Sequence, residues 1–462
     1  MLKAFFEWLF GRRRAPQPAT SPAVVPASRI SRPVAETDTR ANALSTPSGE
    51  PLVAYLCREA VLSRDQGIAG YHFMLHEGTL SRIRSGSWEL HHAYSEVLVR
   101  NLARANIGQL LGNRLAFIEL PDAFLSHASL DELPAKNFVL IPVPQAEGTA
   151  QTTTALTEAA TRLRKAGFRI GLPDPLSTPA VLPLLPIADV VVVSAPMLDP
   201  ARGLQLSQLL TASAPQASLL VRDLPSLEDF RFAFKMGASL FQGPFITSRE
   251  DWTEQDLGAS TMRIATLLGR LRQSGDTREI ANLLKQDGAL SLRVLRYVNS
   301  AANAQAESIT SIEHALALLG HERLYRWLVL LACGTDGNNG RASAALETAL
   351  VRARMMELLA ANQPPIQRES LFLVGLLSLA DVIMRVPLDK VLTPLALAPE
   401  VTSALQGNDG PLYPLLELAI ACEGGEGGQE RIQQVSQRCG VTAEQASNCH
   451  IQALSWAMEV QQ

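Results

Sequence analysis

The sequence lacks an apolar run of the roughly 20 residues that a membrane-spanning helix needs, so we expect no segment that crosses a bilayer. It also lacks paired cysteines. The five, at positions 57, 333, 422, 439 and 449, show none of the CxxC spacing that zinc and redox sites use. Scattered cysteines in an odd number are typical of a reducing compartment, and we expect a cytoplasmic protein.

An excess of charge of one sign is missing as well. The 41 basic and 45 acidic residues nearly cancel, which leaves a formal net charge of −4. Such a chain offers no overall field for nucleic acid, although a local basic patch remains open. We therefore expect no nucleic-acid partner.

The first 14 residues form a short amphipathic segment with its apolar side chains ahead of its charges. They are Leu2, Phe5, Phe6, Trp8, Leu9 and Phe10, followed by Arg12, Arg13 and Arg14. A secretory signal would carry its charges first. One interpretation is weak contact with a membrane surface, with the arginines on anionic headgroups, which would make the protein peripheral to the inner membrane. The alternatives are a frayed tail and a docking peptide for another protein.

Residues 15–50 are rich in Pro, Ala, Ser and Thr and poor in large apolar residues. That composition cannot offset the entropy of ordering, so it predicts a disordered linker. The chain of 462 residues is long for one hydrophobic core. We predict two folded domains, residues 51–250 and 251–462.

In the first domain, apolar strand-like runs alternate with helical patterns. The clearest runs are residues 115–120, 138–141, 169–172, 189–193 and 218–221. Nearly continuous apolar strands indicate a parallel sheet covered by helices on both faces. Repeated βα units of this number suit a barrel, but periodicity alone leaves an open sheet as an alternative.

The second domain contains helical periodicity instead. The stretches are 260–275, 277–286, 288–300, 310–334, 342–361, 369–385, 411–423 and 443–460. They predict an all-α domain. Ser311 stands where it can cap a helix that begins at Ile312.

Five motifs of the first domain follow one another in the order found in EAL domains, the phosphodiesterases of cyclic di-GMP, and the domain resembles that family. They are residues 70–75 (GYHFML), 117–121 (FIELP), 167–174 (GFRIGLPD), 188–194 (ADVVVVS) and 237–243 (GASLFQG). The resemblance implies a TIM-like α/β barrel.

Active EAL enzymes hold two divalent metal ions through oxygen ligands at the ends of strands, and these ions generate the attacking hydroxide. In this chain most of the corresponding positions have changed. His72 replaces a glutamate, Glu119 an amide, Ile141 a glutamate, Pro173 an aspartate, Val192 a lysine, Ser194 an aspartate, and Arg222 and Pro225 two glutamates, while Asp174 keeps its expected aspartate. Gln242 and Gly243 also keep the family pattern.

These replacements predict that the chain is not an enzyme and holds no metal and no cofactor. A rebuilt metal site from Glu119, Asp174 and Asp223 is not expected, because single carboxylates at strand ends are usually solvated or capping residues. Binding of cyclic di-GMP without cleavage remains an alternative, and an active phosphodiesterase is a less favoured one.

The second domain resembles HDOD domains over residues 258–425. The stretches that carry the resemblance are 280–290, 291–300, 309–320, 324–328 and 369–381. The His-Asp pair of the related metal-dependent hydrolases is replaced by Ser378 and Leu379. The two resemblances together imply a signalling adaptor, an EAL-type barrel followed by an all-α HDOD domain, that acts through contacts with other signalling proteins.

Overall fold

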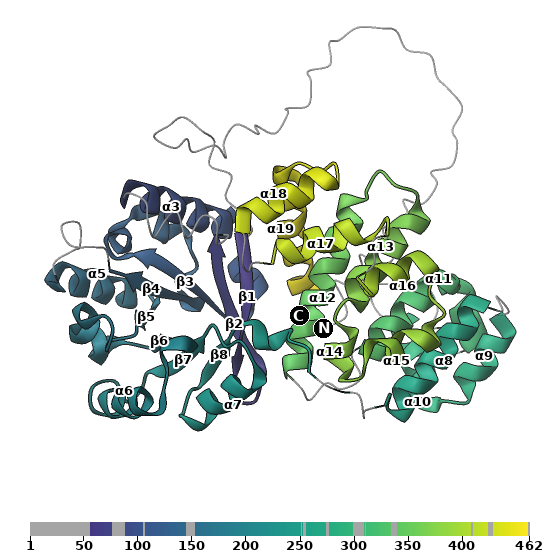
Figure 1. Ribbon diagram of the computed structural model, residues 1–462, viewed down its shortest axis with the longest axis horizontal. Helices are drawn as coiled ribbons and strands as arrows, with labels where there is room; N and C mark the ends of the chain where they lie inside the picture. Colours follow the sequence, from purple (N-terminus) through teal and green to yellow (C-terminus); the bar gives the residue numbers. More distant parts are fainter. Residues whose placement is uncertain are drawn as a thin grey trace, which may run out of the picture.

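The computed structural model describes residues 56–75, 88–104, 107–144, 153–250, 252, 256–273, 277–298, 309, 311–333, 340–407, 410–423 and 428–460. The amphipathic segment and the linker predicted for residues 1–50 lie outside the described residues. Within the described ranges, no helix combines the length and the apolar character needed to span a membrane. Figure 1 shows a barrel beside a helical domain.

Eight strands close into a barrel in sequence order, which confirms the predicted barrel over the open sheet. Strand β1 runs antiparallel to both of its neighbours, β2 and β8, and the remaining pairs are parallel. The strands are β1 (Leu56–Ser63), β2 (Ile68–Leu75), β3 (Leu115–Pro121), β4 (Phe138–Val143), β5 (Arg169–Pro173), β6 (Val190–Ser194), β7 (Ser218–Arg222) and β8 (Leu240–Gln242).

Apolar side chains fill the interior of the barrel, because alternate residues of each strand point inward. The buried interior residues are Val61, Phe117, Val139, Ile141, Val190, Val192, Leu220 and Leu240. Gly171 makes room for this packing, since a Cβ there would lie 2.6 Å from Cγ1 of Ile141. The helices around the barrel are α3 (Trp88–Arg104), α4 (Ile107–Leu111), α5 (Thr153–Lys165), α6 (Pro200–Ser213) and α7 (Leu227–Lys235).

Short 3-10 helices complete the barrel domain. They are η2 (Asp122–Ser126), η3 (Ala128–Glu132), η4 (Ala135–Asn137), η5 (Pro179–Ile187), η6 (Ala195–Met197) and η7 (Pro244–Ile246). The last of these belongs to the exit segment, residues 244–250, which leads from β8 toward the helical domain.

The second half of the chain is helical, as predicted. Its elements are α8 (Ala259–Gln273), α9 (Thr277–Lys285), α10 (Gly288–Val298), α11 (Ile312–Cys333), α12 (Gly340–Leu359), α13 (Pro365–Leu377), α14 (Ala380–Met384), α15 (Leu388–Leu392), η9 (Thr393–Leu395), α16 (Pro399–Leu405), α17 (Tyr413–Ala421), α18 (Gly428–Arg438) and α19 (Ala443–Val460). The predicted cap is present, since Ser311 Oγ accepts a hydrogen bond from the backbone N–H of His314 at 3.2 Å.

Two stretches that we predicted as continuous helices are interrupted. Helix α11 kinks at Gly320, whose φ of 70° lies in the left-handed region that glycine tolerates. The stretch 369–385 breaks between α13 and α14, where Leu379 has a φ of −123° and a ψ of 19°. Helices α15, α16 and α18 were not predicted, because their apolar repeats are too short or too polar to show a clear period.

Helices α12 and α19 lie between the barrel and the rest of the helical domain (Figure 1). Ala344 of α12 belongs to one apolar cluster of the barrel, and Met458 of α19 belongs to another. The core of each half therefore continues into the other half, and the residue limits 51–250 and 251–462 stay predictions.

Candidate functional site

The mouth of the barrel gathers seven of the positions that we singled out from the sequence. They are His72, Glu119, Ile141, Pro173, Val192, Ser194 and Arg222, on strands β2 to β7. Strand register places them on the inward face, since His72 pairs with the interior residue Phe117, and Glu119 pairs with Ile141. The predicted convergence of these positions follows from the alternation of side chains along adjacent strands.

Pro225 and Asp174 lie apart from this group. Pro225 is exposed beyond the end of β7. Asp174 forms an ion pair with Arg202 of α6 and accepts a hydrogen bond from Ser177 Oγ at 3.0 Å. Asp174 therefore acts as a local structural carboxylate in this fold.

Arg222 is the positively charged residue of the mouth that contacts two carboxylates. It forms an ion pair with Glu119 and lies 3.5 Å (Nε to Oδ2) from Asp223, which accepts a hydrogen bond from Ser194 Oγ at 2.6 Å. Burial lowers the pKa of Arg222, but Glu119 and Asp223 outweigh burial, so the pKa is raised overall and the guanidinium stays charged.

His72 is 9% exposed, and its environment keeps it neutral. Burial lowers the pKa of the imidazole, and the nearby charge of Arg222 lowers it further, while Glu119 and Asp223 act in the opposite direction. A neutral imidazole next to a charged Arg222–Glu119 pair is thus the state expected at pH 7.

Glu59 also belongs to the mouth, and the sequence analysis missed it. It pairs with His72 across the antiparallel β1–β2 ladder and contributes to the raised pKa of Arg222. The available signal was its place two residues before Val61, which is an interior residue. Alternation along β1 therefore puts Glu59 on the inward face.

The mouth does not fit a pair of divalent cations. Among the residues that the structure describes, no three His, Cys, Asp or Glu side chains converge as metal ligands would. Glu119 and Asp223 both contact the guanidinium of Arg222, and Asp174 contacts Arg202. Two Mg²⁺ ions would need several oxygen ligands that are not already neutralised by arginine.

Ser378 and Leu379, the replaced His-Asp positions, occupy the break between α13 and α14. Ser378 Oγ donates to the carbonyl of Gly375 at 2.7 Å and accepts from Nη1 of Arg352 at 3.1 Å. Arg352 in turn donates from Nε and Nη2 to the two carboxylate oxygens of Glu423, at 2.6 and 2.7 Å. This position therefore holds a buried arginine network.

A second polar network joins the two domains, and none of its partners could be identified from the sequence. Glu347 of α12 is 2% exposed and forms an ion pair with Arg58 of β1. Tyr71 donates its hydroxyl to Glu347 Oε2 at 2.8 Å, and Arg114 lies 3.5 Å from the same oxygen. The Arg58 guanidinium also stacks over the Tyr71 ring, 4.5 Å from its centroid. We call Glu347, Arg58, Tyr71 and Arg114 the interdomain network.

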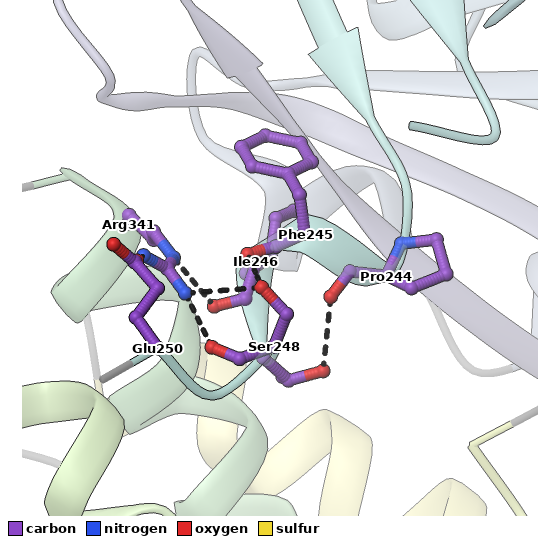
Figure 2. A network of polar contacts seen from close by, with 7 residues as sticks. Pro244, Phe245, Ile246, Ser248, Glu250 and Arg341 are labelled. Atoms are coloured by element: carbon purple, nitrogen blue, oxygen red, sulfur yellow. Dashed lines mark hydrogen bonds and ion pairs between the residues drawn. The ribbon is translucent and has the colours of Figure 1, made fainter. Parts of the chain in front are cut away.

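Arg341, at the start of α12, holds the exit segment. Figure 2 shows its guanidinium facing Ile246, Ser248 and Glu250. Nε donates to the carbonyl of Ile246 at 3.2 Å, Nη2 donates to the carbonyl of Ser248, and Nη1 pairs with the carboxylate of Glu250. The connection between barrel and helices is thus fixed by side-chain contacts as well as by the chain itself.

Known proteins that are similar to this chain cover both of its halves. The model of the HDOD domain matches residues 260–396. The uncharacterized protein YuxH of Bacillus subtilis is 22% identical over 415 residues, which cover 87% of this chain and 97% of that protein. The cyclic di-GMP phosphodiesterase CdgJ of Vibrio cholerae is 24% identical over 411 residues, covering 88% of this chain and 93% of the relative.

Similar solved structures include an EAL domain protein from Listeria monocytogenes, with a TM-score of 0.34 and 13% identity over 42% of this chain and 87% of that one. Another is the Bacillus subtilis YkuI protein, with an EAL domain, in complex with cyclic di-GMP and calcium. Its TM-score is 0.34, with 14% identity over 52% of this chain and 72% of that one.

The relationship to CdgJ contradicts our prediction that the chain is not an enzyme, because a relative aligned over most of both chains is a phosphodiesterase. That prediction rested on motif positions carried over one by one. A comparison of single positions takes no account of the similarity of the whole chain, and that similarity is what relates it to CdgJ. This chain combines a closed eight-stranded barrel with a helical domain that matches the HDOD model over residues 260–396, and most of its length is similar to a cyclic di-GMP phosphodiesterase.

Proposed function

We propose that this chain is a signalling protein whose barrel and HDOD domain act as one unit and pass a change of state to a protein partner. The observation that carries this proposal is the interdomain network around Glu347. A buried carboxylate there links one domain to two arginines and a tyrosine of the other. Breaking a buried ion pair costs about 3–5 kcal/mol, so the domains remain docked unless another interaction replaces it.

The similarity to known proteins indicates which kind of partner to propose. Both curated relatives align across the barrel and the helical domain, which favours a function that needs both halves. The proposed partner is therefore another signalling protein that contacts the docked pair of domains. The contact of the N-terminal arginines with a membrane surface stays a prediction.

The test is affinity capture from the native cells with the full chain, the Glu347→Gln variant and each half alone. A partner that binds the full chain and is weakened by Glu347→Gln supports the proposal. The control is Glu96→Gln, which removes a half-buried pair with Arg100 on α3 and should leave capture unchanged. Equal capture of the same partner by one isolated half would contradict a function of the docked pair.

Hydrolysis of cyclic di-GMP is the second candidate function, and the name of the relative CdgJ favours it. Arg222 is the cation at the mouth that would contact a phosphodiester, and Glu119 and Glu59 are the carboxylates near it. Incubation of the full chain with cyclic di-GMP and either Mg²⁺ or Mn²⁺ tests it. Product that disappears in Glu119→Gln would establish this activity, and absence of product at micromolar protein would remove the candidate.

Binding of cyclic di-GMP without cleavage is distinguished by calorimetric titration. A ligand phosphate at the mouth would contact Arg222, so Arg222→Gln should weaken binding while Arg231→Gln, on the exposed face of α7, should not. No detectable heat at micromolar concentrations would rule out this variant of the proposal.

A further inference from the structure

A cavity of about 460 Å³ opens where the exit segment meets the helical domain. Ser378 and Leu379, in the break between α13 and α14, form part of its wall. The exit segment contributes Thr247 and Arg249, and α12 contributes Arg352. The cavity is therefore built from the connection between the domains and from the helical domain.

The lining of this cavity includes two arginines whose guanidinium groups differ in exposure and in their partners. The Arg352 side chain is 7% exposed and already holds Glu423 and Ser378. The Arg249 side chain is 58% exposed, and its Nε pairs with Oδ2 of Asp381 at 2.8 Å. The described residues offer the outer nitrogens of Arg249 one distant acceptor, the Ser378 carbonyl at 3.5 Å. Arg249 thus keeps donors available for a ligand.

Much of the remaining lining is aliphatic or aromatic. It includes Leu388, Leu405, Leu416, Ile420 and Tyr413. A cavity of a few hundred Å³ with an apolar surface and a few convergent polar groups is the usual form of a small-molecule site. A ligand with an apolar body would cover these side chains, while its charged end would reach Arg249.

We propose that this cavity binds a small organic anion, a phosphate or carboxylate that carries an apolar ring or chain. The planar guanidinium of Arg249 can donate two parallel hydrogen bonds to such a group from its outer edge, while Nε remains on Asp381. Arg352 belongs to the same lining but holds Glu423 through Nε and Nη2, so Arg249 is the group that meets the anion. The ligand adds a partner to Arg249 and displaces none of the existing ion pairs.

Occupancy would tighten the connection between the domains, and this part rests on the proposed function. Arg249 lies between Ser248 and Glu250 in the chain, and Arg341 contacts both of these neighbours (Figure 2). A ligand on Arg249 would anchor the exit segment to α13 and α14 as well as to α12. Binding to the native state alone raises the melting temperature by mass action.

The experiment uses the full chain with 2-naphthyl phosphate as the probe, and with inorganic phosphate and 2-naphthol as separate arms. We expect saturable binding of the aryl phosphate by calorimetry, a raised Tm, and much weaker binding of either part alone. Arg249→Leu should weaken binding at least about tenfold, which corresponds to about 1.4 kcal/mol. Arg249→Lys keeps the charge and loses the planar guanidinium. Its affinity for the aryl phosphate should lie between those of the wild type and Arg249→Leu.

Arg231→Leu, the same change at an exposed arginine of α7, is the matched control and should bind like the wild type. The melt of Arg249→Leu without ligand shows whether that variant is folded. Absence of saturable binding, or equal binding by folded Arg249→Leu, would overturn the inference. Failure of the proposed function would show separately, in the capture experiment with Glu347→Gln, which uses no probe.

Discussion

At the scale of single residues, Glu347 shows how this chain uses buried charge. Its carboxylate is 2% exposed and meets Arg58, Arg114 and Tyr71 in one place. Desolvation of a carboxylate costs several kcal/mol, and only close opposite charges and hydrogen bonds offset that cost. Such a group specifies one docking geometry, because any displaced arrangement leaves the carboxylate without partners.

We predict that Glu347→Gln lowers the free energy of unfolding by about 3–5 kcal/mol, because it leaves the Arg58 guanidinium buried without its counter-charge. Urea denaturation of the full chain measures the loss. Glu96→Gln on α3 removes a surface i,i+4 pair and should change stability by less than about 0.5 kcal/mol. Equal losses in the two variants would show that the interdomain network contributes nothing special.

Because His72 is buried, we predict that the stability of the fold depends on pH. Its folded-state pKa lies below the ordinary value of 6.5, chiefly because of burial, so the unfolded chain takes up the proton first as the pH falls. Stability is therefore highest above pH 6.5 and decreases below it, until the folded-state pKa is reached. The slope from one such group is at most about 1.4 kcal/mol per pH unit. His72→Gln should flatten this dependence in urea titrations between pH 7 and 5, whereas an unchanged slope would assign it to other groups.

At the scale of elements, α12 is the central contact of the molecule. It packs against α13 and α19 on one side and carries Arg341, Ala344 and Glu347 toward the barrel. Gly340 at its first turn lets the helix reach the β1–β2 hairpin. A Cβ at that position would lie 1.1 Å from the carbonyl oxygen of Gln66.

Gly340→Ala should therefore separate α12 from the hairpin and destabilise the chain, although alanine favours a helix more than glycine does. We expect a loss of about 1–3 kcal/mol, the usual range for an overpacked contact. Gly288→Ala at the start of α10 is the control, since nothing lies within 4 Å of a Cβ there. It should be neutral or stabilise by up to about 1 kcal/mol. A melting temperature of Gly340→Ala at or above that of Gly288→Ala would contradict the close approach.

The elements also show what local pattern can and cannot predict. Strands β3 to β7 were predicted nearly to their ends, because each is an apolar run that is buried on both faces. The breaks at Gly320 and at Leu379 were missed, since the apolar period continues across both. A break of this kind is decided by what packs against the helix.

At the scale of the whole molecule, two buried cysteines lie in the contact between the barrel and the helical domain. Cys57 of β1 donates its thiol to the backbone carbonyl of Cys422, 3.3 Å away, just after α17. Burial raises the pKa of Cys57 well above its usual value and that of Cys422 to about 12. Both thiols should therefore be unreactive while the halves stay docked, because the thiolate is the reactive form.

We predict that iodoacetamide at pH 8 modifies Cys57 and Cys422 only when the domains separate or the chain unfolds. Peptide mass spectrometry after timed labelling measures each site. The half-buried Cys439, directly after α18, serves as an internal reference. Glu347→Gln should accelerate labelling of Cys57 relative to Cys439. Similar rates for the two cysteines in the wild type would contradict a closed interface.

The sequence by itself determined the order of a barrel and a helical domain, the segments of strands β3 to β7, and seven of the positions at the barrel mouth. These follow from local periodicity and from the alternation of side chains, which depend on neighbours along the chain. It misled us on the relationship to an enzyme, because single motif positions were compared and the similarity of the whole chain to CdgJ was not considered. Only the tertiary structure decided the interdomain network, the grip of Arg341 on the exit segment, and the cavity at Arg249. The physical reason is that the burial of a charge depends on its partner, and Tyr71 and Glu347 are 276 residues apart in the chain.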